Sequence, residues 1–408
     1  MVPARFNARI EALDQQPPPD SRTFGRGGVL KIAYALAGEG RGHAVRAISL
    51  GKGLIERGHE IEFFTCGDAL ELLQETFGHN SVHDLETPRF VIVKNRVSIL
   101  RTGLASIRFF IKQRRRKKKF ARTLRSLNIE AIISDFEPTF PRVARQLKLP
   151  FISFNSQRFS LDAKLDNLLT FRQRLKLLPI KIICRFFAPN PQLSLVSKGF
   201  NLKPNKPTAH ILGPMLRPEF FPGAWRPTDT HVIAYLRTSV LQHLPAIAEH
   251  AKSHGLSLKL YGHYPQNVPD NVEIRPISND GFIHDLMTAN WIVQTAGTQL
   301  LGEVGTISIP SMCIPEPGQV EQEINAILAQ KAFPNVNILH PKSTSIQALN
   351  GVLERCQEES MTSTIQNGRS QAVLIIDTFL NDLESQTAEC DQSQELALRT
   401  TYERVSAN

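Results

Sequence analysis

The sequence predicts an α/β protein in which two doubly wound parallel sheets follow one another along the chain. Short apolar runs alternate with amphipathic helical segments, and a proline-rich stretch divides this alternation into two halves. The length of 408 residues suits two domains of roughly 150 to 200 residues each. Each half is therefore expected to be a Rossmann-like domain.

The first domain is predicted at 29–215. Its strands are the apolar runs 29–36, 60–65, 131–134 and 151–154. Apolar residues at 44–50 and 54–55 predict a helix between the first two strands, which ends at Arg57 and Gly58. Residues 1–28 are polar and proline-rich, and we expect a disordered lead-in there.

The second domain is predicted at 216–385, after prolines at 214, 218, 222 and 227 that indicate a linker. Its strands are predicted at 231–236, 256–261, 291–293 and 310–315, and a final helix at 372–383. The residues from 386 to 408 are polar and are expected to form a tail.

The composition is that of an ordinary globular protein, with 41% apolar and 21% charged residues. No apolar run approaches the ~18 residues of a membrane span, and the N-terminus lacks the apolar core of a signal peptide, so a cytoplasmic location is expected. The five cysteines show no paired spacing, which favours reduced thiols over a zinc site or a disulfide framework.

The positive charge is concentrated in one segment. Residues 88–188 hold 24 of the 48 Lys and Arg residues but only 5 of the 38 Asp and Glu residues. A solvated face, an anionic membrane and nucleic acid are the possible explanations. Bulky apolar neighbours, such as Phe109, Phe110 and Leu175, favour a membrane and make nucleic acid unlikely. We expect residues 104–125, together with 171–181, to bind an anionic membrane surface peripherally, at the inner face of the membrane.

A glycine-rich turn, A-G-E-G-R-G-H at 37–43, follows the first strand. Its glycines, Gly38, Gly40 and Gly42, do not have the G-x-G-x-x-G spacing of a dinucleotide site, and the second strand lacks the terminal acid that holds a ribose. The turn instead leaves His43 at the start of a helix, beside the open carboxyl end of the sheet. A helix-capping histidine, or a turn that serves packing alone, is the alternative.

At this point the sequence resembles a known family. The runs G-E-G-R-G-H-A-V-R-A (38–47) and L-I-E-R-G-H-E-I-E-F-F-T (54–65) are similar to the N-terminal signature of GT-B glycosyltransferases of the MurG-like, family 28 group. The resemblance implies two domains facing across a cleft, where the histidine of the turn contacts or activates the acceptor. The run S-D-F-E-P (134–138) resembles a sparsely characterised branch of these proteins.

The S-D-F-E-P run also supplies a carboxylate for His43. Related nucleotide-sugar transferases pair the cleft histidine with an aspartate at about this distance along the chain, which implies that Asp135 is the partner of His43. A carboxylate on one ring nitrogen fixes the tautomer and makes the other nitrogen more basic, as a general base for a sugar hydroxyl requires. A strand-end cap is the alternative role for Asp135.

The second half resembles the donor-binding motif of the same superfamily at 289–303 and 309–326. The turn at Gly297 and Thr298 opens a helix whose free N–H groups can hold a diphosphate. Glu303 can accept hydrogen bonds from ribose hydroxyls. The remaining candidates are Gln319 and Gln322, which offer amides to the sugar; Phe282 and Ile283, in the stretch that the resemblance implies reads the base; and Arg237, near the phosphate. The chain departs from the family pattern at Thr295, Ala296 and Asn155.

Together these residues predict an inverting, metal-independent transfer of a hexosyl group from a UDP-sugar to a hydroxyl of a membrane-resident or lipid-linked acceptor. His43 is the expected base, and the helix that starts near Gly297, with Arg237, stabilises the departing diphosphate. No Asp-x-Asp triplet indicates a metal, and no cofactor beyond the UDP-sugar co-substrate is implied. A UDP-sugar 2-epimerase of the same fold and a non-catalytic binder of sugar nucleotides or nucleic acid are the alternatives.

Overall fold

The computed structural model describes residues 28–38, 41–85, 113–228, 230–262, 267–276, 279–340, 345–358, 367–383 and 385, and two short strands, β4 (Ile92–Val93) and β5 (Arg96–Val97). The predicted lead-in up to residue 27, the predicted tail, Gly40 and residues 104–112 of the basic segment lie outside these residues.

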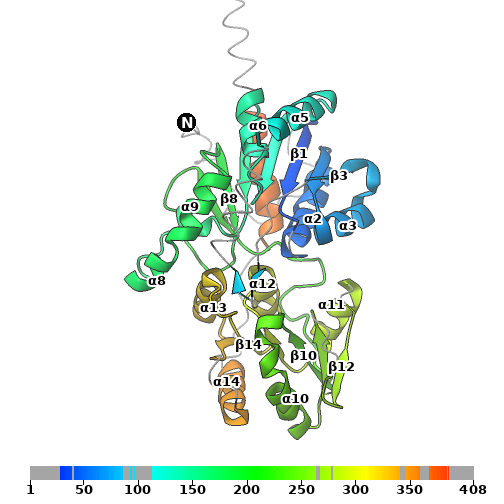
Figure 1. Ribbon diagram of the computed structural model, residues 1–408, viewed down its shortest axis with the longest axis vertical. Helices are drawn as coiled ribbons and strands as arrows, with labels where there is room; N and C mark the ends of the chain where they lie inside the picture. Colours follow the sequence, from blue (N-terminus) through cyan, green and yellow to red (C-terminus); the bar gives the residue numbers. More distant parts are fainter. Residues whose placement is uncertain are drawn as a thin grey trace, which may run out of the picture.

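The first domain is built on a seven-stranded parallel sheet (Figure 1). Its strand order is β3-β2-β1-β6-β7-β8-β9. The strands are β1 (Lys31–Leu36), β2 (Glu60–Thr65), β3 (Val82–Asp84), β6 (Ala131–Asp135), β7 (Phe151–Phe154), β8 (Leu193–Ser197) and β9 (Ala209–Leu212). Strands such as β6 and β8 are buried along their whole length because helices cover both faces of the sheet.

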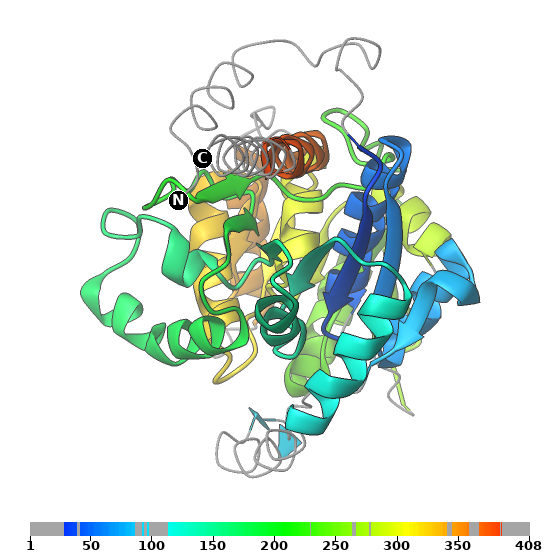
Figure 2. The same cartoon turned by 90° about the horizontal axis from the view of Figure 1, so that it is seen from above.

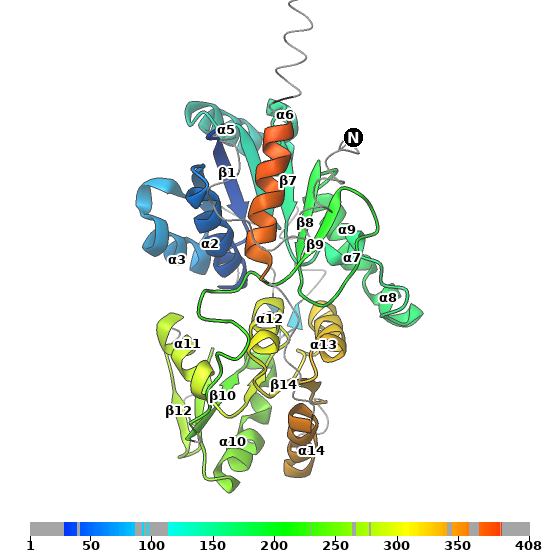
Figure 3. The same ribbon diagram turned by 180° about the vertical axis from the view of Figure 1, so that it is seen from behind.

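The helices of this domain form two buried layers. One layer packs α2 (Arg41–Glu56) and α3 (Gly67–Phe77) on one face of the sheet, and the other packs α5 (Gln113–Ser126) and α6 (Phe140–Leu147) on the opposite face. The remaining elements are η1 (His79–Ser81), α7 (Phe159–Asp162), α8 (Phe171–Lys176) and α9 (Leu178–Phe187). The α8 helix lies at the edge of the molecule, away from both sheets (Figures 1 and 3).

The second domain has a six-stranded parallel sheet of order β12-β11-β10-β13-β14-β15. The strands are β10 (His231–Tyr235), β11 (Ser257–Tyr261), β12 (Val272–Ile274), β13 (Ile292–Gln294), β14 (Ser311–Cys313) and β15 (Val336–Ile338). The helices are η2 (Thr238–His243), α10 (Leu244–Ser253), α11 (Asn279–Thr288), α12 (Thr298–Ile307), α13 (Val320–Ala332) and α14 (Ile346–Glu358). The two parallel sheets confirm the fold class that the sequence predicts.

The final helix, over 368–383, returns to the first domain, whereas the sequence analysis places it in the second. Its apolar residues, among them Ala372, Ile376 and Phe379, lie in the same buried cluster as α2 and β1. Figure 2 shows this helix and α5 on opposite sides of the first sheet, and Figure 3 shows its course along that sheet. The chain therefore passes between the domains twice. Where the two crossings meet, Gly368 N–H donates to the Pro214 carbonyl at 2.9 Å.

The strand orders place a crevice at the same point of each sheet. In the first sheet the order reverses between β1 and β6, and in the second between β10 and β13. The loops after two such strands run in opposite directions, which opens a crevice at the carboxyl ends of the strands. Residues 36–38, 41–43 and 135–138 border the first crevice, and residues 235–239 and 295–298 border the second.

Candidate active site

His43 and Asp135 meet at the crevice of the first sheet. Asp135 ends β6 in register with Leu36 at the end of β1, and His43 lies in the first turn of α2, which follows β1. The Nδ1 atom of His43 lies 3.0 Å from Oδ1 of Asp135. The side chain of Asp135 is fully buried, whereas that of His43 is 13% exposed. The pairing predicted from the sequence therefore has hydrogen-bonding geometry.

Arg46, one helical turn after His43, binds the same carboxylate. Its Nη2 atom lies 2.8 Å from Oδ2 and 3.1 Å from Oδ1 of Asp135, and 2.9 Å from Nδ1 of His43. Burial alone would raise the pKa of Asp135, but Arg46 and His43 lower it below its ordinary value. An ionised Asp135 accepts the proton of Nδ1, so we assign the lone pair of the histidine to Nε2.

Two further residues of the S-D-F-E-P run, Phe136 and Glu137, have distinct structural roles beside Asp135. Phe136 has a φ of 58°, which is uncommon outside glycine, and its ring stacks on that of His43 with the centroids 6.4 Å apart. The buried carboxylate of Glu137 accepts hydrogen bonds from the N–H groups of Thr139 and Phe140 at 2.8 Å and so caps the start of α6. Asp135 thus orients His43, which lines the cavity, whereas Glu137 stabilises the start of α6.

In the glycine-rich turn, one glycine allows close packing of two loops and another lines the cavity. A Cβ atom on Gly38 would lie 2.2 Å from the carbonyl oxygen of Cys66, so only glycine allows the loops after β1 and β2 to pack this closely. Gly42 lines the cavity and faces Gln299 of α12, whose Cβ lies 3.9 Å from the position of an added Cβ. The turn therefore brings the starts of α2 and α12 close together.

The start of α12 forms the opposite wall of the cavity. Gly297 occupies its N-cap position, and nothing lies within 4 Å of a Cβ atom added there. Leu301 N–H donates to the Gly297 carbonyl at 3.0 Å, so the N–H groups of Thr298, Gln299 and Leu300 precede the first intrahelical hydrogen bond. These groups and the positive end of the helix dipole suit an anion.

Glu303 lies one turn further along α12 and is already bound by protein groups. Arg217, from the segment between the domains, forms a two-pronged pair with it: Nη2 to Oε2 at 2.9 Å and Nε to Oε1 at 3.1 Å. Gln299 also donates to Oε1 at 3.0 Å. The carboxylate is thereby held rigidly while it still lines the cavity. Oε1 accepts from both Arg217 and Gln299, whereas Oε2 accepts from Arg217 alone and keeps a lone pair for a ligand hydroxyl.

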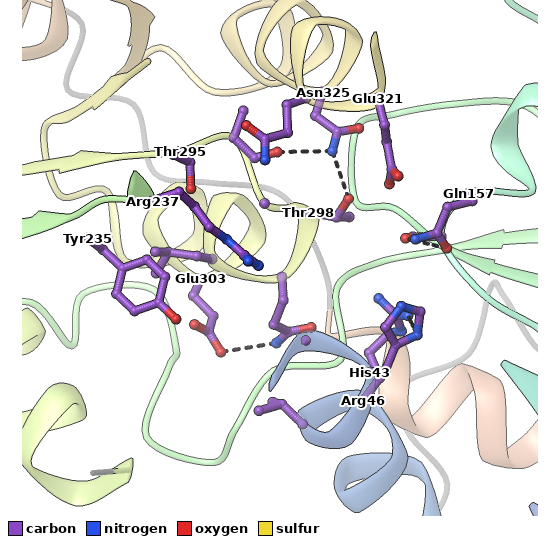
Figure 4. A pocket seen from close by; sticks show the side chains of 18 of the residues that line it. His43, Arg46, Gln157, Tyr235, Arg237, Thr295, Thr298, Glu303, Glu321 and Asn325 are labelled. Atoms are coloured by element: carbon purple, nitrogen blue, oxygen red, sulfur yellow. Dashed lines mark hydrogen bonds between the residues drawn. The ribbon is translucent and has the colours of Figure 1, made fainter. Parts of the chain in front are cut away.

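The structure brings most of the candidates together in one cavity of about 300 Å³ between the domains (Figure 4). The residues that line it are Gly42, His43, Val45, Arg46, Leu72, Ser156, Gln157, Arg217, Tyr235, Arg237, Phe282, Thr295, Ala296, Gly297, Thr298, Gln299, Leu300, Glu303, Glu321, Gln322 and Asn325. In Figure 4, His43 and Arg46 approach from one side, and Thr298, Asn325 and Arg237 approach from the other.

Three of the candidates lie differently from what the sequence suggests. Ile283 is buried in the core beside Phe282, and Gln319 precedes α13 at its N-cap position; neither lines the cavity. Gln322 lines it, but its amide exchanges two hydrogen bonds with Glu316, accepting from the backbone N–H at 2.9 Å and donating to Oε1 at 2.7 Å. Gln322 therefore orders the loop that precedes α13.

Sequence reasoning missed Arg46, Arg217, Gln157, Glu321 and Asn325. A signal existed for Arg46, because a spacing of three residues places it on the same helical face as His43. Asn325 stands in the E-Q-x-x-N-A stretch, but its role is visible only in its contacts. Within the described residues, no cluster of three or more His, Cys, Asp or Glu side chains is arranged to hold a metal.

Comparisons with known proteins identify related glycosyltransferases. A family profile described as "Glycosyl transferase family 1" matches residues 30–346. Two relatives from Methanosarcina acetivorans, each described as an uncharacterized glycosyltransferase, are 22% and 25% identical; each alignment covers 74% of this chain, and 82% and 84% of the relatives.

Solved structures show the same fold. MurG of Acinetobacter baumannii superposes with a TM-score of 0.53 at 15% identity, over 85% of this chain and 99% of that one. UGT89C1 of Arabidopsis thaliana, solved with quercetin, has a TM-score of 0.58 at 14% identity, over 86% of this chain and all of that one (100%). The fold is thus GT-B, and the matching profile is that of family 1, whereas the sequence resemblance named family 28. The chain belongs to the glycosyltransferases of the family described as Glycosyl transferase family 1.

Proposed function

We propose that this glycosyltransferase moves a hexosyl group from a UDP-sugar to a hydroxyl of a membrane-resident acceptor, with inversion at the anomeric carbon. The observation that carries the proposal is the position of His43, which is paired with the buried Asp135 and lines the same cavity as the start of α12. This pairs a base with a leaving-group site, as a single displacement requires. The MurG-like resemblance of the turn and of the S-D-F-E-P run supports the same donor and acceptor classes.

The acceptor side needs one base. Nε2 of His43 takes the proton of the acceptor hydroxyl while its oxygen forms a bond to the anomeric carbon. The bond from that carbon to the diphosphate breaks on the opposite face, so UDP leaves with the electron pair and the configuration inverts. Asp135 stabilises the imidazolium that forms, and Arg46 keeps the carboxylate in place.

The donor side needs groups that offset the growing charge of the diphosphate. The N–H groups of the first turn of α12 and the guanidinium of Arg237 serve this purpose without a metal ion. Glu303, held by Arg217 and Gln299, accepts hydrogen bonds from the ribose hydroxyls. Thr295 and the backbone beside Phe282 complete the donor wall.

Replacing Glu303 with Ala should weaken UDP binding by roughly 1–3 kcal/mol, because the ribose hydroxyls and Arg217 both lose a partner in a largely buried site. Isothermal titration calorimetry with UDP measures the change. Glu323→Ala is the matched control, because Glu323 pairs with Lys176 on the surface and does not line the cavity. Unchanged UDP affinity in a folded Glu303→Ala variant would remove Glu303 from the donor site.

A turnover screen tests the proposed reaction as a whole. UDP-sugars are supplied with and without lipid extracts, and both UDP release and the labelled sugar are followed. Lipid-dependent release of UDP with labelled lipid supports the proposal. An isomerised sugar in the absence of acceptor would identify a 2-epimerase instead, and binding without turnover would identify a binding protein.

The membrane part of the proposal rests on two surfaces of the first domain. On α5, Arg114, Arg115, Lys118 and Lys119 are exposed, whereas Phe120, Ala121 and Leu124 pack into the core. Arg116 is also turned inward, and burial lowers its pKa. The described part of the basic segment therefore supplies charge, but its own apolar face is already covered.

Exposed apolar side chains occur instead on α8 and α9. Phe171 is 73% exposed and Ile182 is 68% exposed, and Leu175, Leu178 and Phe186 are exposed as well. These helices carry five Lys and Arg residues and no Asp or Glu. Cations beside bulky apolar groups suit the interface of an anionic bilayer. No helix among the described residues is long and apolar enough to cross a bilayer, and we propose peripheral contact.

Flotation with anionic liposomes should separate the two contributions. The wild type should float at low salt; changing Arg114, Arg115, Lys118 and Lys119 to Gln should reduce flotation through lost attraction, at about 1 kcal/mol per cation before screening. A Phe171→Ser, Ile182→Ser variant should reduce it at all salt concentrations. Phe221→Ser, which removes another exposed apolar side chain (56%) outside these helices, is the control. Equal flotation of all proteins would favour a soluble acceptor.

A further inference from the structure

Lys198 places a buried ammonium group beside the donor wall of the cavity. It follows β8 in the first domain, and its side chain is fully buried. Its Nζ atom donates to Oδ1 of Asn325 at 2.6 Å and lies 3.4 Å from Oγ1 of Thr298, both in the second domain. The ring centroid of Phe159 lies 3.9 Å from Nζ. Among the described residues, no carboxylate forms an ion pair with this group.

The contact with Lys198 determines how Asn325 lies. An ammonium group can only donate, so the amide oxygen of Asn325 must face it. The amide nitrogen then faces the turn before α12, where it donates to the Ala296 carbonyl at 3.0 Å and lies 3.1 Å from Oγ1 of Thr298. Lys198 thus holds, from the other domain, the turn that opens the anion-binding helix.

The positive charge of Lys198 is not needed for the contact with Asn325. Burial lowers the pKa of Lys198 to about 8; of the charged groups that face it, Glu321 on α13 raises that value and Arg46 on α2 lowers it. The thiol of Cys184 on α9 also faces it but stays neutral, because burial raises the pKa of that thiol to about 12. A hydroxyl or amide could orient Asn325 without the cost of burying a cation. The ammonium, which no carboxylate of the described residues pairs with directly, and the positive end of α12 therefore both place positive charge beside the cavity.

We propose that Lys198 is a positioning residue for the donor diphosphate: it aligns Asn325 and the start of α12 across the domain boundary, and its charge is balanced by the diphosphate when the donor binds. This inference rests on the proposed function, because it requires the diphosphate to lie at α12. It assigns to the first domain a part in donor binding, in addition to its part in acceptor binding.

The test compares UDP with uridine, because only UDP carries the diphosphate. Lys198→Met removes the charge and the hydrogen bond, and Lys198→Gln removes the charge but keeps a donor for Asn325. At pH 7 we expect UDP affinity to fall at least tenfold in Lys198→Met and less in Lys198→Gln, with uridine affinity nearly unchanged. Thermal unfolding of each variant verifies that it is folded.

The pH dependence gives a second readout that a merely structural lysine would not show. Protonated Lys198 favours UDP, so the wild-type ratio of UDP to uridine affinity should fall about fivefold to tenfold between pH 7 and pH 9 as the ammonium loses its proton. The ratio should not fall in either variant, because ionisation of the base affects UDP and uridine alike and ionisation of the phosphate only adds negative charge to UDP. The wild-type series decides the question even if Lys198→Met does not fold.

Two results would overturn the inference: a folded Lys198→Met variant with wild-type UDP affinity, or a flat wild-type affinity ratio between pH 7 and pH 9. Failure of the proposed function looks different. In that case the wild type itself does not bind UDP, or Glu303→Ala and Lys198→Met both bind UDP as the wild type does.

Discussion

His43→Ala should lower turnover by about 10²- to 10⁴-fold and leave UDP affinity unchanged, because a general base acts in the transition state and not on the bound nucleotide. The structure supports this separation. His43 belongs to α2 of the first domain, whereas the proposed nucleotide contacts belong to α12 and the strand ends of the second. The loss of the imidazole also leaves Asp135 paired with Arg46, so the fold should survive.

The measurement is kcat at saturating donor, together with calorimetric titration of UDP. His83→Ala is the matched control, because His83 also lies against a carboxylate, with Nε2 2.7 Å from Oε2 of Glu62, but does not line the cavity. We expect this control to keep its turnover. Near-normal turnover of His43→Ala would leave His43 with a structural role and would move the base elsewhere.

Asp135→Asn should have two large effects. The fully buried carboxylate compensates the guanidinium of Arg46, whose side chain is only 4% exposed, so its loss leaves a buried charge unpaired and should destabilise the protein by about 3–5 kcal/mol. Turnover should also fall by about 10²-fold or more, because an amide neither stabilises the imidazolium nor holds one tautomer of His43.

A double variant separates the two effects. Arg46→Met combined with Asp135→Asn removes both charges of the buried pair, and denaturant unfolding should show that most of the lost stability returns. Its turnover should stay low, because the partner of His43 is still missing. Restored turnover in the double variant would show that Asp135 acts only by neutralising Arg46.

The alternation of apolar runs with helical segments determined that the chain forms parallel sheets, and where most of their strands lie. It also located the two regions that meet at the cavity, because the carboxyl ends of parallel strands lie at the same edge of a sheet. Local motifs located His43 after the first strand and Asp135 at the end of another, and the family resemblance implied that the two residues pair. The strands β3, β8, β9, β12 and β15 were not predicted, although β8 is buried along its whole length.

Whether a helical side chain lines the cavity or enters the core could be decided only from the structure. Adjacent residues on a helix point about 100° apart, so Phe282 lines the cavity while Ile283 enters the core. The same limit applies to the basic helix α5. The sequence shows apolar residues beside the cations but does not show whether they face a membrane or the protein core. In the fold that face packs on the first sheet, and the exposed apolar surface lies on α8 and α9 instead.

The amino-acid sequence by itself determined the α/β class, the order of the two domains, and the positions of the turn and of the S-D-F-E-P run beside strand ends. Only the tertiary structure decided the pairs formed over long distances: Arg217 with Glu303, Lys198 with Asn325, and the final helix with the first sheet. The reason is physical. Periodicity reports which residues are buried, whereas the partner of a buried charge depends on how the two domains pack and where the chain crosses between them.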